Sequence, residues 1–188
     1  GYPLLLKSQL AVGGRGKAGA IVKCKYEAEL ESKFNELLHK QVKGELPRGI
    51  LLEEMVCIKK ELYLSLFLNR NKRCYSLISS AEGGVEIESA ESKVVIDISI
   101  DGLAAQKAEE TASKLGLKGK TVISFIDLTT KLSRLVSEKE AELAEINPVA
   151  ILDDESLIAL DAKVIIDDNA MFRHPELKKY EHISELEK

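Results

Sequence analysis

The hydrophobic and polar positions of the chain alternate most regularly in one segment before its middle. Leucine occupies every second position from Leu62 to Leu68, and the intervening residues share the opposite side. A period of two predicts a β-strand with one apolar face. After a turn at 69–73, residues 75–80 are predicted to return as the second strand of a hairpin.

Other segments repeat the patterns of strand and helix. Short apolar runs predict further strands at 4–10, 20–25, 50–54, 143–152 and 157–165. Apolar residues at helical spacing predict helices at 27–42, 103–115 and 121–137. The stretch that follows Gly84 is polar and has no clear period. This mixture of helices and hairpins predicts an α+β or mixed α/β fold.

Composition narrows the classes of function. Hydrophobic residues make up 45% of the 188 residues and charged residues 31%, which is typical of a globular protein. Twenty-seven Lys and Arg against 31 Asp and Glu give a net charge of -4, which argues against nucleic-acid binding. No apolar run reaches the roughly 18 residues of a membrane span. The three cysteines are widely spaced and match no zinc pattern, so we expect reduced thiols and a cytoplasmic location.

A glycine-rich segment follows the first predicted strand. Residues 13–19 read GGRGKAG and contain Arg15 and Lys17. Glycines let backbone N–H groups approach phosphate oxygens, and the two cations add positive charge. Lys7, in the preceding strand, can hold a phosphate as a point charge. The segment is not a Walker loop, and a flexible hairpin tip beside a surface lysine is the alternative.

Three glutamates are candidates for contacts with a base and a sugar. Glu53 and Glu54 end an apolar strand, and Glu61 lies on the polar side of the alternating strand. Ionised carboxylates accept hydrogen bonds, so they suit an adenine amino group or ribose hydroxyls. Surface salt bridges are the alternative interpretation.

The last two predicted strands carry oxygen ligands in facing positions. Asn147 and Asp161 are equally distant from Asp154 in the connecting turn, so a simple hairpin places them opposite each other. Opposed Cβ atoms lie roughly 4.5–5.5 Å apart, a spacing at which both oxygens can hold magnesium with phosphates and waters. Glu145 lies two residues earlier on the same face. The alternative is a cross-strand hydrogen bond, and a one-residue slip would reverse the face.

Five segments in this order resemble the β subunits of ADP-forming succinate–CoA ligases, which have an ATP-grasp fold. They are 7–19, 53–64, 80–88 (SAEGGVEIE), 145–148 (EINP) and 160–175, which contains LDAK and DNAMFRHP. Together they are spread over most of the length of the chain and are far more specific than any single motif. The related ATP-citrate lyases are similar but fit the glycine segment less well.

The resemblance implies a nucleotide site. Lys7 and the loop Gly14-Arg15-Gly16 would hold the phosphates of ATP, with GTP as the other possible substrate. Glu53 and the backbone near Val56 would contact the adenine, and Glu61 the ribose. These roles come from the resemblance, residue by residue.

It also implies a metal, a catalytic residue and a partner. Asn147 and Asp161 would bind Mg²⁺, and Glu145 would lie where a phosphorylated histidine of the α subunit arrives. The family reaction is succinate + CoA + ATP ⇌ succinyl-CoA + ADP + phosphate. The α subunit supplies the CoA site, and the family forms hetero-oligomers whose size the sequence leaves open.

The implied fold is an ATP-grasp domain with two β-rich lobes and flanking helices. Residues 1–50 and 86–188 would form the larger lobe, and 51–85 the hinge and a hairpin. We expect a fragment that lacks the N-terminal part of the fold and the C-terminal CoA-ligase domain. Alone it would be inactive, because no histidine here matches the phosphorylated one. Ala20 stands where the family has glycine.

Two alternatives stay open at this point. One is an ATP-grasp ligase that acts on another carboxylate, such as malate or citrate. The other is a non-catalytic nucleotide-binding module, although the presence of Glu145 favours an enzyme. The expected location would be the mitochondrial matrix in a eukaryote.

Overall fold

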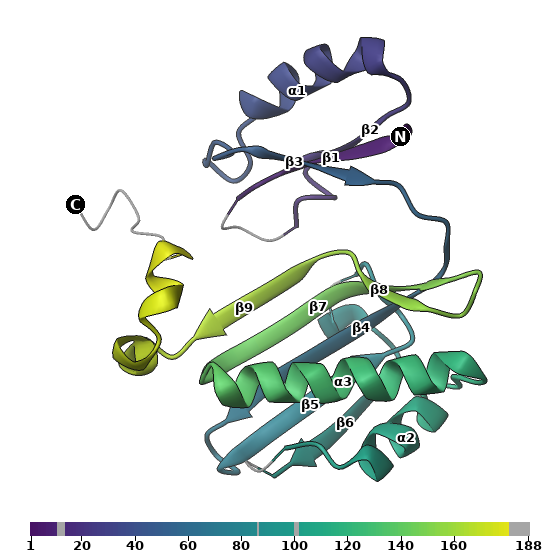
Figure 1. Cartoon of the computed structure of the whole chain (residues 1–188), viewed down its shortest axis with the longest axis vertical. Coiled ribbons are helices and arrows are strands. Elements are labelled where there is room, and N and C mark those ends of the chain that lie inside the picture. Colours follow the sequence, from purple (N-terminus) through teal and green to yellow (C-terminus); the bar gives the residue numbers. More distant parts are fainter. Residues whose placement is uncertain (11–13, 86, 100–101, 181–188) are drawn as a thin grey trace. The chain divides into compact units, whose positions relative to one another are not determined.

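The computed structural model describes residues 1–10, 14–85, 87–99 and 102–180 (Figure 1). The chain divides into two compact units, Gly1–Cys57 and Ile58–Lys188. Two sequence features extend beyond the described residues, because the glycine segment begins at Gly13 and the signature at 80–88 includes Glu86. Among the helices of the described segments, none is long and apolar enough to cross a bilayer.

The first unit is a three-stranded antiparallel sheet covered on one face by a helix (Figure 1). The strands are β1 (Leu4–Ser8), β2 (Ile21–Cys24) and β3 (Ile50–Glu54), in the order β2-β1-β3. The helix is α1 (Leu30–Leu38), preceded by the short 3-10 helix η1 (Glu27–Glu29). Leu6, Cys24 and Leu37 form its buried core, so alternate residues of β1 point away from α1.

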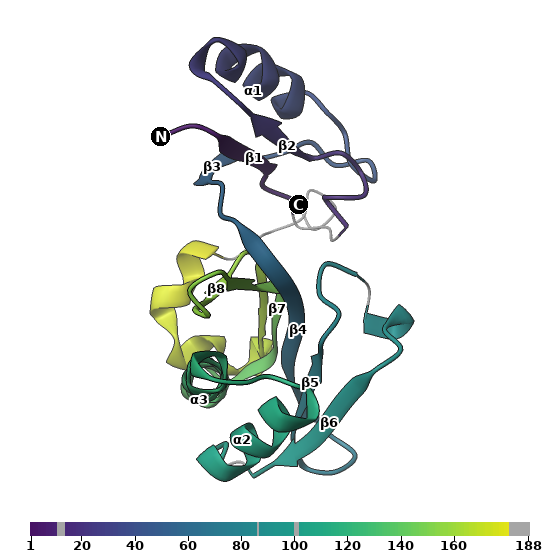
Figure 2. The same cartoon turned by 90° about the vertical axis from the view of Figure 1, so that its right-hand side faces the viewer.

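The second unit contains a six-stranded antiparallel sheet in the order β6-β5-β4-β7-β8, with β9 also paired to β7. Its strands are β4 (Ile58–Asn69), β5 (Cys74–Ser80), β6 (Lys93–Ile98), β7 (Ala141–Leu152), β8 (Leu157–Ala159) and β9 (Ala162–Ile166). Two helices, α2 (Ala105–Lys114) and α3 (Lys120–Glu138), pack side by side on one face of this sheet (Figures 1 and 2). Three short 3-10 helices complete the unit: η2 (Ile87–Ser89), η3 (Asp168–Arg173) and η4 (Pro175–Tyr180).

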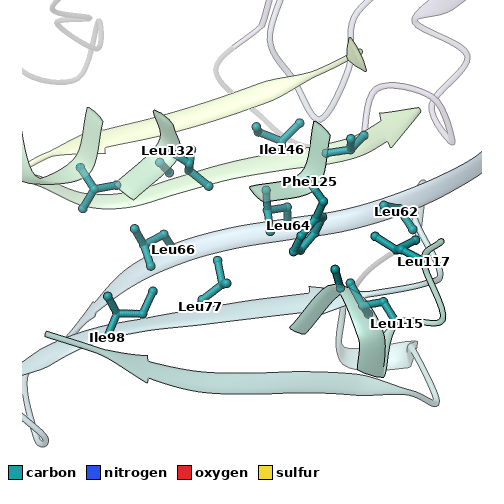
Figure 3. Packing of buried hydrophobic residues seen from close by; sticks show 14 of the residues in the cluster. Leu62, Leu64, Leu66, Leu77, Ile98, Leu115, Leu117, Phe125, Leu132 and Ile146 are labelled. Atoms are coloured by element: carbon teal, nitrogen blue, oxygen red, sulfur yellow. The ribbon is translucent and has the colours of Figure 1, made fainter. Parts of the chain in front are cut away.

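The alternating leucines of β4 explain where the core lies. Leu62, Leu64 and Leu66 are almost fully buried and face the helices, with Phe125 of α3 packed among them (Figure 3). Each such side chain contributes roughly 1.5–3 kcal/mol when it is fully removed from water. Because side chains of both β4 and β7 pack in this core, the intervening side chains of the two strands lie together on the opposite face of the sheet.

Most predicted elements are confirmed, with boundary changes. Strand β3 has the predicted bounds, whereas the helix predicted at 27–42 ends at Leu38. The prediction for the stretch after Gly84 was incomplete, because β6 lies there. Its alternating Val94 and Ile96 pack on the core. The strand predicted at 157–165 is divided into β8 and β9.

The division into units differs from the predicted lobes. The predicted hinge and hairpin, 51–85, is not a separate part, because β3 pairs with β1 while β4 and β5 belong to the larger sheet. Residues 1–50 lie in the first unit, not with 86–188. The physical reason is the long ladder between β4 and β7, which ties the hairpin to the C-terminal strands.

Candidate functional site

A β-bulge lies at the centre of the second sheet. Leu62 pairs with Val149 and Leu64 pairs with Ile146, so β7 has two residues, Asn147 and Pro148, where β4 has only Tyr63. Proline has no N–H group to donate to a ladder and is tolerated at bulges. Bulges redirect side chains and are frequent beside functional sites.

On the other side of β7, Asn147 faces Asp161. The backbone N–H of Asn147 donates to the carbonyl of Asp161 at 3.1 Å. The pairs Val149–Ala159 and Ile146–Ala162 on either side have the same register. The predicted facing positions are therefore confirmed. A shared face for the two side chains, and magnesium binding by them, stay predictions.

The side chain of Asn147 is held by a loop that follows β5. Its Oδ1 accepts a hydrogen bond from the N–H of Gly84 at 2.8 Å, and its Nδ2 donates to the carbonyl of Val85 at 3.0 Å. An amide oxygen has two lone pairs, so Oδ1 retains the capacity to coordinate a cation. The two hydrogen bonds with the loop thus determine the orientation of the amide group, with Oδ1 towards Gly84 and Nδ2 towards Val85.

Two glycines allow this loop to approach β4. The N–H of Gly83 donates to the carbonyl of Glu61 at 3.1 Å. A Cβ at Gly83 would lie 2.5 Å from the carbonyl oxygen of Leu62. Gly84 has φ +71°, and a Cβ there would lie 2.4 Å from Oε2 of Glu61. A side chain is therefore excluded at Gly83 by backbone atoms and strained at Gly84 by its positive φ, and the loop contacts both Glu61 and Asn147.

Glu145 is joined to a residue that the sequence did not indicate. The hydroxyl of Tyr63 donates to Oε2 of Glu145 at 2.9 Å. Tyr63 is only 3% exposed. Burial raises the pKa of its phenol, a hydrogen bond with Ser65 lowers it, and the Glu145 carboxylate raises it further, so the phenol is protonated at neutral pH. The period-two pattern placed Tyr63 on a polar face but could not show its partner.

In the first unit, the structure pairs two predicted site residues. The Nζ of Lys7 lies 2.7 Å from Oε2 of Glu53, and the Lys7 side chain is 7% exposed. Both residues lie on the face of the sheet opposite α1, because Leu5 pairs with Glu53 and Lys7 with Leu51. The glutamate predicted to contact adenine therefore neutralises the lysine predicted to hold phosphate.

From Gly14 to Gly19, the described part of the glycine segment forms successive tight turns before β2. Ala18 donates to the carbonyl of Gly14 and Gly19 to that of Gly16, at 3.1 and 3.0 Å. The guanidinium of Arg15 donates to the carbonyl of Ser8 at 3.0 Å. Positive φ at Gly14, +83°, explains the glycine there.

Two lysines near this segment were missing from the sequence prediction. Lys40 donates from Nζ to the carbonyl of Gly19 at 2.9 Å, and Nζ of Lys43 lies 3.8 Å from the Cβ position of Gly14. Both come from the turn after α1. Their only sequence signal was positive charge around the end of the helix predicted at 27–42, and such charge is common on protein surfaces.

The predicted site residues are thus shared between the two units. Lys7, Glu53, Val56 and the loop Gly14-Arg15-Gly16 belong to the first, with Val56 in the connection after β3. The second contains Glu61, Glu145, Asn147 and Asp161.

The described side chains fit a magnesium site with few protein ligands. Within the described ranges, no three His, Cys, Asp or Glu side chains form a group that could hold a metal. Magnesium often has only one or two protein ligands and takes its other oxygens from phosphates and waters. An amide oxygen that is already oriented, as in Asn147, suits this role.

The comparisons with known proteins agree with this architecture. Residues 1–151 match the family model for the ATP-grasp domain. The chain belongs to the ATP-grasp family. Among curated relatives, the succinate–CoA ligase [ADP-forming] β subunit of Ignicoccus hospitalis is 40% identical over 196 aligned residues, covering 100% of this chain and 52% of that protein. The chain therefore spans about half the length of the curated relatives it matches.

Solved structures share the ATP-grasp fold at lower identity. The dinucleotide-forming acetyl-coenzyme A synthetase of Ca. Korarchaeum cryptofilum, in complex with coenzyme A and Ca-AMPCP, matches with a TM-score of 0.73 and 22% identity over 89% of this chain and 77% of that one. Another structure of that enzyme contains Mg-AMPPCP and has a phosphohistidine segment that points towards the nucleotide-binding site. It matches with a TM-score of 0.67 and 20% identity over 89% of this chain and 78% of that one. ATP citrate lyase of Methanothrix soehngenii, in complex with citrate and coenzyme A, matches with a TM-score of 0.71 and 21% identity. The match covers 97% of this chain and 42% of that one. These similarities show the fold alone.

Proposed function

We propose that this chain is the nucleotide- and magnesium-binding part of an ADP-forming succinate–CoA ligase β subunit. The reaction is succinate + CoA + ATP ⇌ succinyl-CoA + ADP + phosphate. The 40% identity to succinate–CoA ligase β subunits supports the substrate. ATP is the proposed nucleotide because these relatives are named ADP-forming, and the proposed location is the cytoplasm.

The observation that carries the proposal is the placement of Asn147. A bulge presents it opposite Asp161, and a glycine loop orients its amide beside Glu61. The amide oxygen proposed as a magnesium ligand and the carboxylate proposed for the ribose hydroxyls thus adjoin the same glycine loop within one unit. Magnesium neutralises charge on the phosphoryl group as it is transferred.

The first unit contains the other residues for which a role in nucleotide binding is proposed. Lys7 and the loop Gly14-Arg15-Gly16 hold the phosphates, and Glu53 with the backbone near Val56 holds the adenine. The ion pair between Lys7 and Glu53 keeps both side chains ordered before binding. ATP then replaces part of this pairing, because its phosphates attract Lys7 and its adenine amino group donates to Glu53.

The proposed partner is an α subunit that supplies a histidine and the CoA site. In the transfer from ATP, the bond between the γ-phosphorus and the bridging oxygen of ADP breaks and a bond to the histidine nitrogen forms. Glu145 accepts the N–H of the other ring nitrogen and so orients the imidazole. The structure of the acetyl-coenzyme A synthetase with a phosphohistidine segment directed at its nucleotide site supports this arrangement.

The test is ADP release by the complete β subunit together with its α subunit. Succinate, malate and citrate are compared as substrates in the presence of CoA, Mg²⁺ and ATP or GTP. Release that depends on succinate and CoA is expected. Release that depends on malate or citrate but not on succinate would change the assigned acid. The absence of any acid-dependent release would contradict the proposal that the protein is an acid–CoA ligase.

A second experiment locates the phosphorylated residue. The chain of residues 1–188, incubated with γ-labelled ATP and Mg²⁺, is expected to stay unlabelled, and after the α subunit is added any label is expected on the α subunit. Stable labelling of this chain alone, lost on substitution of His39 or His174, would show that the chemistry resides here.

A further inference from the structure

We propose that Tyr63 is a positioning residue that holds the carboxylate of Glu145 for the incoming histidine of the partner. The inference rests on the proposed function, because it assumes that Glu145 receives that histidine. Its basis is the hydrogen bond of 2.9 Å from the Tyr63 hydroxyl to Oε2 of Glu145.

The bulge explains how the two side chains meet. Ser65 is the residue directly opposite Glu145, and Tyr63 lies two positions away along β4. Diagonal neighbours in an antiparallel pair are separated by roughly 7–8 Å, a distance that long aromatic side chains can span. At Tyr63 the register changes, because β7 contributes both Asn147 and Pro148 there. The phenol therefore extends from the bulge towards Glu145.

The environment of the phenol makes this bond specific. Tyr63 is 3% exposed, and a buried tyrosine hydroxyl requires a hydrogen-bond partner. Burial raises the pKa of the phenol most, and the carboxylates of Glu145 and Glu88 raise it further, so the phenol stays a donor at neutral pH. A bond from a neutral donor to an ionised acceptor is stronger than a neutral pair.

Holding one oxygen has a consequence for the other. A glutamate side chain has several rotatable bonds, and a free one samples many positions. With Oε2 fixed by Tyr63, Oε1 remains to accept the N–H of an imidazole that arrives from another subunit. Fixing a reacting group in advance removes the cost of ordering it during the reaction, and a misplacement of about 1 Å can lower a rate roughly a hundredfold.

The experiment measures phosphoryl transfer from γ-labelled ATP to the α subunit in the complete complex. Tyr63→Phe removes only the hydroxyl and keeps the buried ring. We expect the maximal transfer rate to fall about 10- to 100-fold. The KM for ATP should change less than about twofold, since Tyr63 is proposed to position Glu145 and is given no role in binding the nucleotide. Tyr75→Phe is the matched control, because Tyr75 packs on the helix-covered face of the same sheet, and it should keep the wild-type rate.

A double-mutant cycle separates the inference from the function on which it rests. Glu145→Gln should lower the rate at least as much as Tyr63→Phe, and the double variant should be no slower than Glu145→Gln. An unchanged rate in Glu145→Gln would overturn the proposed role of Glu145. If Glu145→Gln lowers the transfer rate while Tyr63→Phe keeps the wild-type rate, the role proposed for Tyr63 is overturned and that of Glu145 is not. Additive losses in the double variant would also overturn it, since Tyr63 would then act independently of Glu145.

Circular dichroism and complex assembly are followed for each variant. If Tyr63→Phe fails to assemble, Ser65→Ala provides the second test, because the Ser65 side chain is a hydrogen-bond partner of the phenol. It should lower the transfer rate about two- to fivefold at unchanged KM for ATP. A wild-type rate in an assembled Ser65→Ala complex would count against the proposal.

Discussion

Replacing Gly83 by alanine is expected to separate the glycine loop from β4. The added Cβ would lie 2.5 Å from the carbonyl oxygen of Leu62 and 2.7 Å from its carbonyl carbon and its nitrogen. All three are backbone atoms of a buried strand, so the loop and not the strand has to move. The movement would break the hydrogen bond from Gly83 to Glu61 and draw Gly84 away from Asn147.

The magnitude follows from three contributions. Overpacking of this kind costs about 1–3 kcal/mol, and loss of the hydrogen bond costs about 1 kcal/mol. Reduced freedom of the unfolded chain returns about 0.4–1 kcal/mol. The free energy of unfolding should therefore fall by about 1–3.6 kcal/mol, which corresponds to roughly 2–14 °C in melting temperature for a chain of this length.

The assay is thermal and urea unfolding followed by circular dichroism, since the chain has no tryptophan. Hydrogen exchange at the amide of Gly84 reports the loop itself and should accelerate. Gly49→Ala is the control, because a Cβ there meets nothing within 4 Å and the stability should change by less than about 0.5 kcal/mol. Equal unfolding free energies for the two variants would refute the steric reasoning.

Three further predictions concern the metal, a helix cap and acid stability. Asp161→Ala in the complete enzyme should raise the activation free energy at limiting Mg²⁺ by several kcal/mol, so that turnover falls about a hundredfold or more with little change in melting temperature. Retained turnover would exclude Asp161 as a magnesium ligand. Glu155→Ala should destabilise the second unit by about 1 kcal/mol, because its carboxylate accepts from the N–H of Lys120 at 3.0 Å at the start of α3, whereas Asp153→Ala in the same turn should not. A hydrogen bond from Lys33, followed by one from the backbone of Lys25, lowers the pKa of Glu29 to about 2. Wild type should therefore exceed Glu29→Gln in stability above pH about 4.5, and the difference should vanish as the pH falls towards 2; a difference independent of pH would contradict this.

The sequence predicted those parts of the site that follow from local periodicity. Asn147 and Asp161 could be placed opposite each other because a hairpin with a short turn has a simple register. The bond between Tyr63 and Glu145 could not be predicted, because it depends on which distant strand lies beside β4. The same applies to the hydrogen bond from Gly84 to Asn147, which joins a loop and a strand more than sixty residues apart in the chain. The pairing of Lys7 with Glu53 depended on a strand order, β2-β1-β3, that alternation does not determine.

The interruption between β8 and β9 also bears on the solubility of the protein during folding. Both strands pair with β7, and they carry exposed Ile158, Val164 and Ile165. A continuous strand with such side chains at the border of a sheet would be a template for pairing with another chain. The break at Leu160 and Asp161 leaves strands of three and five residues, and Lys163 adds a charge to the longer one. The interruption that lies opposite Asn147 therefore also discourages the association of two molecules through their sheets.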